Sequence, residues 1–309
     1  MAHLARIQTG KVITMTSRNW WGWIILFTAV GVGVFSVFAA TPKNSDSLDS
    51  LSLAAKNIYY CDTNSKYQTM DLYHPKESNR TITPVIIYIH GGGWNSGSKQ
   101  NNFLRTYGPL FIKEGVSVAA IDYRLSPEDR FPDQNNDITC ALRYLAHHAI
   151  ELRIDIQKSL YVGESAGAEL ATFAALNPPD INSPYPAPLG VIDFYGVTDF
   201  SKIISGAHPD LNARKYLGAN YTQRAAPASP ITYIKNSSPP FLIFHGTADN
   251  IVPASQSKLL HERLTEVGVS SQLVLIRGAH HGFAGYESSK KDYEVIQQNM
   301  KAFIQRVLF

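Results

Sequence analysis

The chain has 309 residues, of which 44% are hydrophobic and 17% charged, as expected for a globular protein with a buried core. Its formal charge of +3 arises within residues 1–40, which hold three basic residues and no acidic ones, so the remainder carries 25 of each sign. A chain without a basic excess is not expected to bind nucleic acid.

Residues 20–40 form an almost uninterrupted apolar run, WWGWIILFTAVGVGVFSVFAA, which follows Arg18. A run of this length with a basic flank is typical of a secretory signal peptide or an N-terminal membrane anchor. We therefore predict that residues 1–40 direct export, with the true start at Met1 or Met15. The remainder would be periplasmic or secreted, or anchored with its catalytic domain outside the cytoplasm.

The rest of the chain divides into a predicted linker and one predicted domain. Residues 41–56 are rich in Ser, Asp, Asn and Lys, which indicates a linker. From 57 to 309, apolar runs typical of buried strands alternate with helical patterns. The predicted strands are 68–73, 85–89, 116–121, 159–162, 190–195, 241–244 and 272–276, and the predicted helices are 133–151, 168–176, 255–267 and 290–307.

This alternation predicts an α/β fold with a mostly parallel central sheet covered by helices on both faces. Active sites of such sheets lie at the carboxyl ends of the strands. The two cysteines, Cys61 and Cys140, could pair in an oxidising compartment, but free thiols fit the sequence equally well. No Cys and His spacing indicates a metal site, and we expect no metal and no organic cofactor.

A Gly-x-Ser-x-Gly motif lies at residues 163–167, between the predicted strand 159–162 and the predicted helix 168–176. This pattern can arise by chance, but a strand before it and a helix after it are typical of a nucleophile elbow. Such a turn would expose the hydroxyl of Ser165. It would also direct the next amide, that of Ala166, at the reacting carbonyl.

A second motif, His-Gly-Gly-Gly-Trp at residues 90–94, directly follows the predicted strand 85–89. Glycines allow the backbone to approach a ligand, and two amides of this loop could stabilise an oxyanion together with the Ala166 amide. A flexible turn and a phosphate-binding loop are the alternatives, but no Lys-Ser/Thr follows. We expect His90 to brace this loop rather than to act as a base.

A serine nucleophile needs a base and an acid that orients the base. Asp249 follows the predicted strand 241–244, and His280 and His281 follow the last predicted strand. The chain order Ser, Asp, His is that of the α/β-hydrolases. Asp193 and Asp199 are weaker candidates for the acid, because one lies inside a predicted strand and the other follows it closely.

Taken together, these motifs resemble the α/β-hydrolase esterases, near the hormone-sensitive-lipase-like group and closest to its bacterial acetyl-xylan and feruloyl esterase-like branch. The resemblance spans about residues 57–309. It is carried by L-Y-H-P at 72–75, H-G-G-G-W at 90–94, D-Y-R-L-S-P at 122–127 with F-P at 131–132, G-E-S-A-G at 163–167, Y-G-V-T-D at 195–199, H-G-T-A-D at 245–249 with V-P at 252–253, and H-G-F at 281–283.

The resemblance implies an α/β-hydrolase fold and hydrolysis of a carboxylic ester through an acyl-enzyme. The site residues that it implies are Ser165 as nucleophile, His281 as base, Asp249 as acid, and the amides of Gly92, Gly93 and Ala166 as the oxyanion hole. It also implies a bracing role for residues 122–124 beneath the site. The H-G-F motif favours His281 over His280.

The substrate would be a small-molecule ester, either short-chain or aromatic, and the sequence does not indicate which acyl group or alcohol is preferred. An aryl-formamidase or an exopeptidase of the same fold is an alternative enzyme, and a catalytically silent hydrolase-fold binding protein is an alternative of another class. Residues 177–238 are rich in Pro, Tyr and Asn and are expected to shape the rim of the pocket.

Overall fold

The computed structural model describes residues 11–14, 52–63, 65–76, 81–178, 185–205, 210–283 and 290–309. Its centre is a nine-stranded sheet in the order β1-β9-β8-β7-β6-β4-β5-β3-β2, in which only β3 runs antiparallel to its neighbours. The strands are β1 (Lys11–Thr14), β2 (Ser52–Tyr59), β3 (Thr69–His74), β4 (Thr83–Ile89), β5 (Ser117–Ile121), β6 (Ile154–Glu164), β7 (Gly190–Phe194), β8 (Phe241–Gly246) and β9 (Ser271–Ile276).

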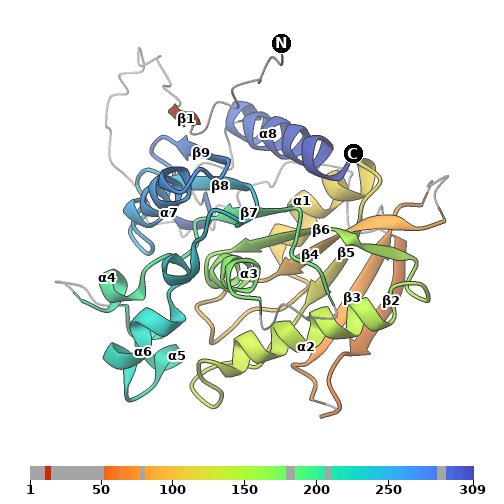
Figure 1. Ribbon diagram of the computed structural model, residues 1–309, viewed down its shortest axis with the longest axis horizontal. Helices are drawn as coiled ribbons and strands as arrows, with labels where there is room; N and C mark the ends of the chain where they lie inside the picture. Colours follow the sequence, from red (N-terminus) through yellow and green to blue (C-terminus); the bar gives the residue numbers. More distant parts are fainter. Residues whose placement is uncertain are drawn as a thin grey trace, which may run out of the picture.

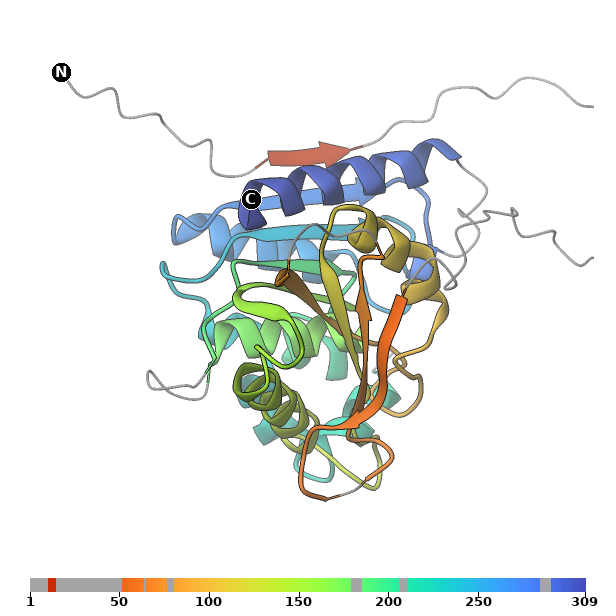
Figure 2. The same ribbon diagram turned by 90° about the vertical axis from the view of Figure 1, so that its right-hand side faces the viewer.

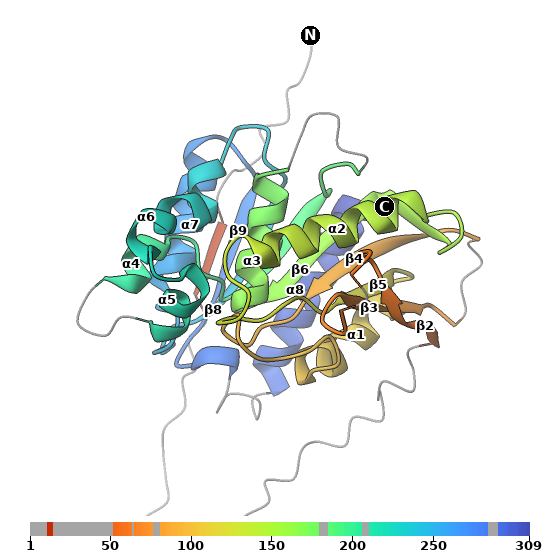
Figure 3. The same cartoon turned by 90° about the horizontal axis from the view of Figure 1, so that it is seen from below.

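Helices cover both faces of this sheet. They are α1 (Asn102–Lys113), α2 (Asp133–His147), α3 (Ala166–Leu176), α4 (Phe200–Ile204), α5 (Leu211–Leu217), α6 (Tyr221–Ala228), α7 (Ser255–Glu266) and α8 (Lys290–Leu308), with short 3₁₀ turns η2 (Pro230–Tyr233) and η3 (His281–Phe283). In Figure 1, α1 and α8 lie above the sheet and α2 and α3 lie below it. Figure 3 shows α4, α5 and α6 grouped beside α7, away from β2.

Two hydrophobic cores separate these layers, one on each face of the sheet. Side chains of α1 and α8, including Phe111 and Met300, form one core with alternate residues of the strands. Side chains of α2, α3 and α7, including Leu142, Leu170 and Leu260, form the other. Strands buried on both faces need apolar residues at successive positions, which is why residues 85–89 of β4 are all apolar. The predicted α/β architecture, a mostly parallel sheet covered by helices on both faces, is therefore confirmed.

The predicted linker extends too far, because its last residues, 52–56, belong to β2. This edge strand pairs antiparallel with β3 through two irregularities of register, and it exposes Leu53 and Tyr59. Asn57 has φ of +51° and donates its amide to Asp71 Oδ1 at 2.8 Å. Irregular pairing and exposure remove the alternating pattern by which a strand is detected. The helix predicted over 133–151 likewise ends earlier, at His147.

The first strand, β1, pairs in parallel with β9 at the edge of the sheet, and Figure 2 shows it above α8 and β9. It falls within residues 1–40, where an export segment is predicted. The apolar run itself, residues 20–40, lies outside the described residues, so its role stays a prediction. Within the described ranges, no helix has the length and apolar character needed to cross a membrane.

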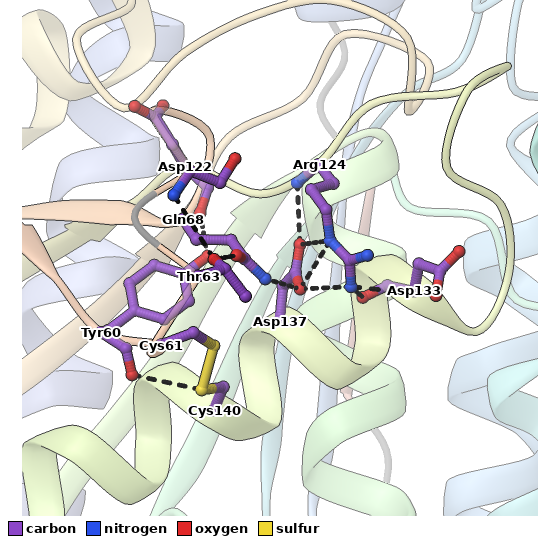
Figure 4. Close-up of a disulfide and its surroundings, with 10 residues drawn as sticks. Tyr60, Cys61, Thr63, Gln68, Asp122, Arg124, Asp133, Asp137 and Cys140 are labelled. Atoms are coloured by element: carbon purple, nitrogen blue, oxygen red, sulfur yellow. Dashed lines mark hydrogen bonds and ion pairs between the residues drawn. A yellow bond between two sulfur atoms is a disulfide. The ribbon is translucent and has the colours of Figure 1, made fainter.

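Cys61 and Cys140 form a disulfide with their Cα atoms 6.0 Å apart. The bond links the connection between β2 and β3 to α2 (Figure 4). Next to it, Gln68 donates to Asp137 at 2.6 Å, and Arg124 binds the same carboxylate at 2.8 Å. The disulfide therefore joins the first hairpin to the helix that carries this buried polar cluster.

Candidate active site

Ser165 lies at the sharp turn between β6, which ends at Glu164, and α3, which begins at Ala166. Its φ of 53° and ψ of −119° are strained for a residue with a side chain. The flanking glycines are required by packing. A Cβ at Gly167 would lie 2.1 Å from the Ile89 carbonyl oxygen, and one at Gly163 would lie 2.2 Å from the Gly167 oxygen. The turn thus has the geometry predicted for a nucleophile elbow.

The structure brings the predicted triad together from three separate strand ends. His281 Nε2 lies 2.9 Å from Ser165 Oγ, and His281 Nδ1 lies 2.7 Å from Asp249 Oδ2. An ionised carboxylate only accepts hydrogen bonds, so the ring proton is assigned to Nδ1. Nε2 is then free to accept the hydroxyl proton of Ser165. This is the arrangement that a serine nucleophile and its general base require.

The other candidates for the acid and the base have different surroundings. Asp193 is buried in β7, where Thr172 and the amide of Gly196 donate to it at 2.9 Å. Asp199 accepts from the Ser201 amide at 3.0 Å and caps α4. The side chain of His280 is exposed.

Asp249 is held so that it stays ionised. Its side chain is 0% exposed, and Oδ1 accepts the amides of Ile251 and Val252 at 2.9 Å each. Burial raises the pKa of this carboxyl, but hydrogen bonds from His245 and His281 outweigh burial and hold the pKa well below its ordinary value. The negative charge is therefore present at neutral pH, where it can stabilise an imidazolium on His281.

The loop after β4 lies directly against the elbow. Gly92 and Gly93 have φ of 117° and 60°, and a Cβ at Gly92 would lie 2.1 Å from the Ser96 carbonyl oxygen. Within the described chain, no hydrogen bond occupies the amides of Gly92 and Gly93. Ala166 is the first residue of α3, so its amide has no acceptor inside the helix. All three predicted oxyanion donors thus remain available.

Several buried groups support this loop. His90 lies 2.7 Å through Nδ1 from the Gly91 carbonyl, and its ring stacks on Tyr123 with centroids 4.3 Å apart. Tyr123 in turn donates to the His90 carbonyl at 2.9 Å. Burial lowers the pKa of His90, so a neutral ring can brace the loop as expected. Lys99, also buried, binds Asp122 at 2.7 Å.

The sequence analysis did not single out Glu164, which lies between Gly163 and Ser165 at a position where the Gly-x-Ser-x-Gly motif specifies no residue type. Its Oε1 accepts from Asn101 at 2.6 Å and from the Gly91 amide at 3.3 Å. Its Oε2 accepts from Tyr195 at 3.3 Å, and the Tyr195 ring packs 4.8 Å from that of His281. One carboxylate therefore connects the elbow, the glycine loop and the residue behind the base. An acidic residue at this position of the motif was the available signal.

The family model of BD-FAE matches residues 70–264. The chain belongs to the BD-FAE family. This BD-FAE-family chain is 31% identical over 211 residues to the probable carboxylic ester hydrolase LipM of Mycobacterium tuberculosis, covering 64% of the chain and 49% of LipM. It is 30% identical over 262 residues to an ethyl acetate hydrolase of Pseudomonas putida, covering 80% of the chain and 79% of that relative.

Among solved structures, a truncated carbohydrate esterase from gut microbiota matches with a TM-score of 0.74 at 25% identity. The match covers 84% of this chain and 97% of that one. The resemblance to α/β-hydrolase esterases is thereby confirmed. The chain spans only about half the length of LipM.

In this BD-FAE-family chain we expect Asp249→Asn to lower kcat by about 10⁴-fold, as the same change does in a serine protease triad. The amide keeps an oxygen for the Ile251 and Val252 amides, so the fold should persist. It carries no charge, and an NH₂ facing Nδ1 of His281 favours the wrong tautomer. Ester-hydrolysis kinetics of the purified variant measure the effect. Asp199→Asn is the control, and greater damage from it would show that the acid is misassigned.

Glu169 of α3 is a second buried acid near the site in this BD-FAE-family domain. It is 0% exposed, and Trp94 Nε1 donates to its Oε2 at 2.9 Å. Its Oε1 has no partner among the described residues. Burial raises the pKa of Glu169 well above its ordinary value, the bond from Trp94 lowers it, and Asp193 raises it further. Glu169 therefore favours the neutral acid in the folded protein.

We expect the free energy of unfolding of Glu169→Gln, relative to that of wild type, to increase as pH rises from about 5 to 8. A raised carboxyl pKa means that the folded state binds a proton that the unfolded state releases, so wild-type stability falls as pH rises above the ordinary carboxyl value. The difference should grow by up to about 1.4 kcal/mol per pH unit within that window. Urea unfolding at pH 5 and pH 8 measures it. If the difference in free energy of unfolding does not change with pH, Glu169 is not a neutral acid in the folded protein.

Proposed function

We propose that this chain is a serine carboxylic-ester hydrolase that acts through an acyl-enzyme. The observation that carries the proposal is the relay of 2.9 Å from Ser165 Oγ to His281 and 2.7 Å from His281 to Asp249. His281 Nε2 takes the Ser165 proton while Oγ bonds to the ester carbonyl carbon. The amides of Gly92, Gly93 and Ala166 would stabilise the resulting oxyanion.

His281 then donates its proton to the departing alcohol, which leaves the acyl group on Ser165. A water molecule repeats the sequence, with His281 as base and Ser165 as leaving group. Apart from the ester and this water molecule, neither half of the reaction needs a further reactant, and neither involves oxidation or reduction. The negative charge of Asp249 stabilises the imidazolium in both halves.

The proposed substrate is a short-chain or aromatic small-molecule ester. The names of the relatives LipM and ethyl acetate hydrolase support an ester substrate. Turnover of acetyl, butyryl, longer-chain and feruloyl esters, compared with a formamide and a dipeptide, tests the proposal. Faster turnover of the formamide or the dipeptide would overturn it in favour of the other enzymes of this fold.

Labelling with a fluorophosphonate separates an enzyme from a silent binding protein. We expect mass spectrometry to find one adduct, on Ser165. An unlabelled folded protein that turns over none of the esters would favour the binding protein.

We further infer that the domain is exported, and that any attachment to a membrane is through residues 1–40. The apolar run and the disulfide between Cys61 and Cys140 support this, because disulfides persist in oxidising compartments. Cell fractionation tests the inference, and we expect the full-length chain in the cell envelope or outside the cell. Untagged protein in the cytosol with Met1 intact would overturn it.

A further inference from the structure

A second imidazole lies against the carboxylate of Asp249. His245 is on β8 with its side chain 0% exposed, and its Nε2 is 3.3 Å from Asp249 Oδ2. The same nitrogen lies 2.8 Å from the Val252 carbonyl oxygen, and Nδ1 lies 2.6 Å from Ser257 Oγ on α7. A carbonyl oxygen only accepts, so the ring proton is assigned to Nε2. Nδ1 then accepts the hydroxyl proton of Ser257.

We propose that His245 is a positioning residue for the hydrolysis. Its Nε2–H donates to the Val252 carbonyl oxygen at 2.8 Å and also lies 3.3 Å from Asp249 Oδ2, so that it helps to hold this oxygen at the place from which it orients His281. Both imidazoles face this one oxygen, His281 at 2.7 Å and His245 at 3.3 Å. The other oxygen, Oδ1, accepts the two backbone amides of the 249–252 turn. With both oxygens held, the carboxylate cannot rotate away from His281. The inference rests on the proposed function.

The donor at His245 also affects how the charge of Asp249 acts on His281. The charged and titratable groups that face His245 are Asp249, Asp193 of the neighbouring strand β7, and Tyr195, whose ring centroid is 6.4 Å from that of the imidazole. A hydrogen bond to a carboxylate stabilises the ionised form and reduces its attraction for a second partner. Without His245, more of that attraction falls on a protonated His281.

The test compares two substitutions at this position. His245→Phe keeps a ring but removes the donor, and His245→Gln keeps a donor near the place of Nε2. We expect His245→Phe to lower kcat by about 10- to 100-fold, the range for a hydrogen bond to a charged group. The midpoint of the acid limb of kcat/KM against pH should move up by about half a unit. His245→Gln should recover part of both changes.

Ser257→Ala is a milder variant that keeps the imidazole. It removes only the hydroxyl that donates to Nδ1, so the ring is free to take the other tautomer and lose its Nε2 proton. We expect kcat to fall by about threefold, and the midpoint of the acid limb to move up by less than in His245→Phe. If His245→Phe does not fold, Ser257→Ala and His245→Gln still decide the question.

The fold supplies a matched control in a second His–Ser pair. His261 of α7 lies 2.9 Å through Nδ1 from Ser271 Oγ at the start of β9, and both residues are buried. This pair is at the amino end of its strand, whereas the triad is at the carboxyl ends. Ser271→Ala removes the same kind of bond and should leave kcat and the pH profile at their wild-type values.

A proton NMR signal separates this inference from the proposed function. The proton between His281 Nδ1 and Asp249 should appear far downfield, vanish in His281→Ala and shift in Ser257→Ala, whether or not the protein hydrolyses esters. Wild-type protein without ester turnover would therefore overturn the proposed function alone. Unchanged pH profiles and an unshifted signal in the folded His245 and Ser257 variants would overturn the positioning role. A fall in kcat without a shift of the pH profile or of the proton signal would also overturn the positioning role.

Discussion

Ser165→Ala is expected to leave a folded protein whose kcat for ester hydrolysis is lower by about 10⁶-fold. The hydroxyl of Ser165 lies 2.9 Å from His281 Nε2, and alanine offers no atom that can form the acyl bond. One lost hydrogen bond at a half-buried position does not threaten the two cores of the sheet. Steady-state kinetics and circular dichroism of the purified variant measure both expectations.

Ser165→Gly is the matched control for the strained backbone. It removes the same hydroxyl, so its activity should be as low as that of the alanine variant. Glycine adopts a φ of 53° at lower cost than serine or alanine, so the free energy of unfolding of Ser165→Gly should exceed that of Ser165→Ala by about 1 kcal/mol. Turnover near the wild-type rate in either variant would remove Ser165 from the mechanism.

The parallel part of the fold was predictable because burial leaves a strong pattern. Strands β4 and β5 are covered on both faces, and every residue of each is buried. Helix α1 was missed, since Gly108 and Pro109 lie within it and both normally interrupt helices. Its Phe103 and Phe111 pack into the core against the sheet, and this tertiary packing outweighs the local preference.

The meeting of Ser165, Asp249 and His281 was predictable because each lies in the turn or loop after a parallel strand, and parallel strands end at one edge of the sheet. The bracing by His90 and Tyr123 was predicted too, but other buried contacts near the site were not. Trp94 and Glu169 are 75 residues apart in the chain, and only the folded structure brings them to 2.9 Å. Glu169 left a local signal as a single acid in the otherwise apolar helix AGAELATFAAL. No local pattern indicates that His245 meets Asp249.

His281→Ala is expected to lower kcat by about 10⁶-fold, while His280→Ala stays within about twofold of wild type. His281 contacts both Ser165 and Asp249, and the Tyr195 ring packs against it. Without an imidazole there, no group takes the serine proton. His280 points to solvent instead. Kinetics of the two variants with one ester, at one pH and with folding checked, measure the ranking.

The backbone of this turn explains why the two neighbours differ. Phe283 donates its amide to the His280 carbonyl at 3.0 Å, and its buried ring packs on Tyr195 with centroids 5.1 Å apart. Gly282, with φ of 69°, allows the tight turn between them. For His280 to contact Ser165 in place of His281, this turn, held by the Phe283 amide and by the Phe283 ring against Tyr195, would have to rearrange. Greater damage from His280→Ala would therefore require a different path for the chain after β9, and it would move the base to His280.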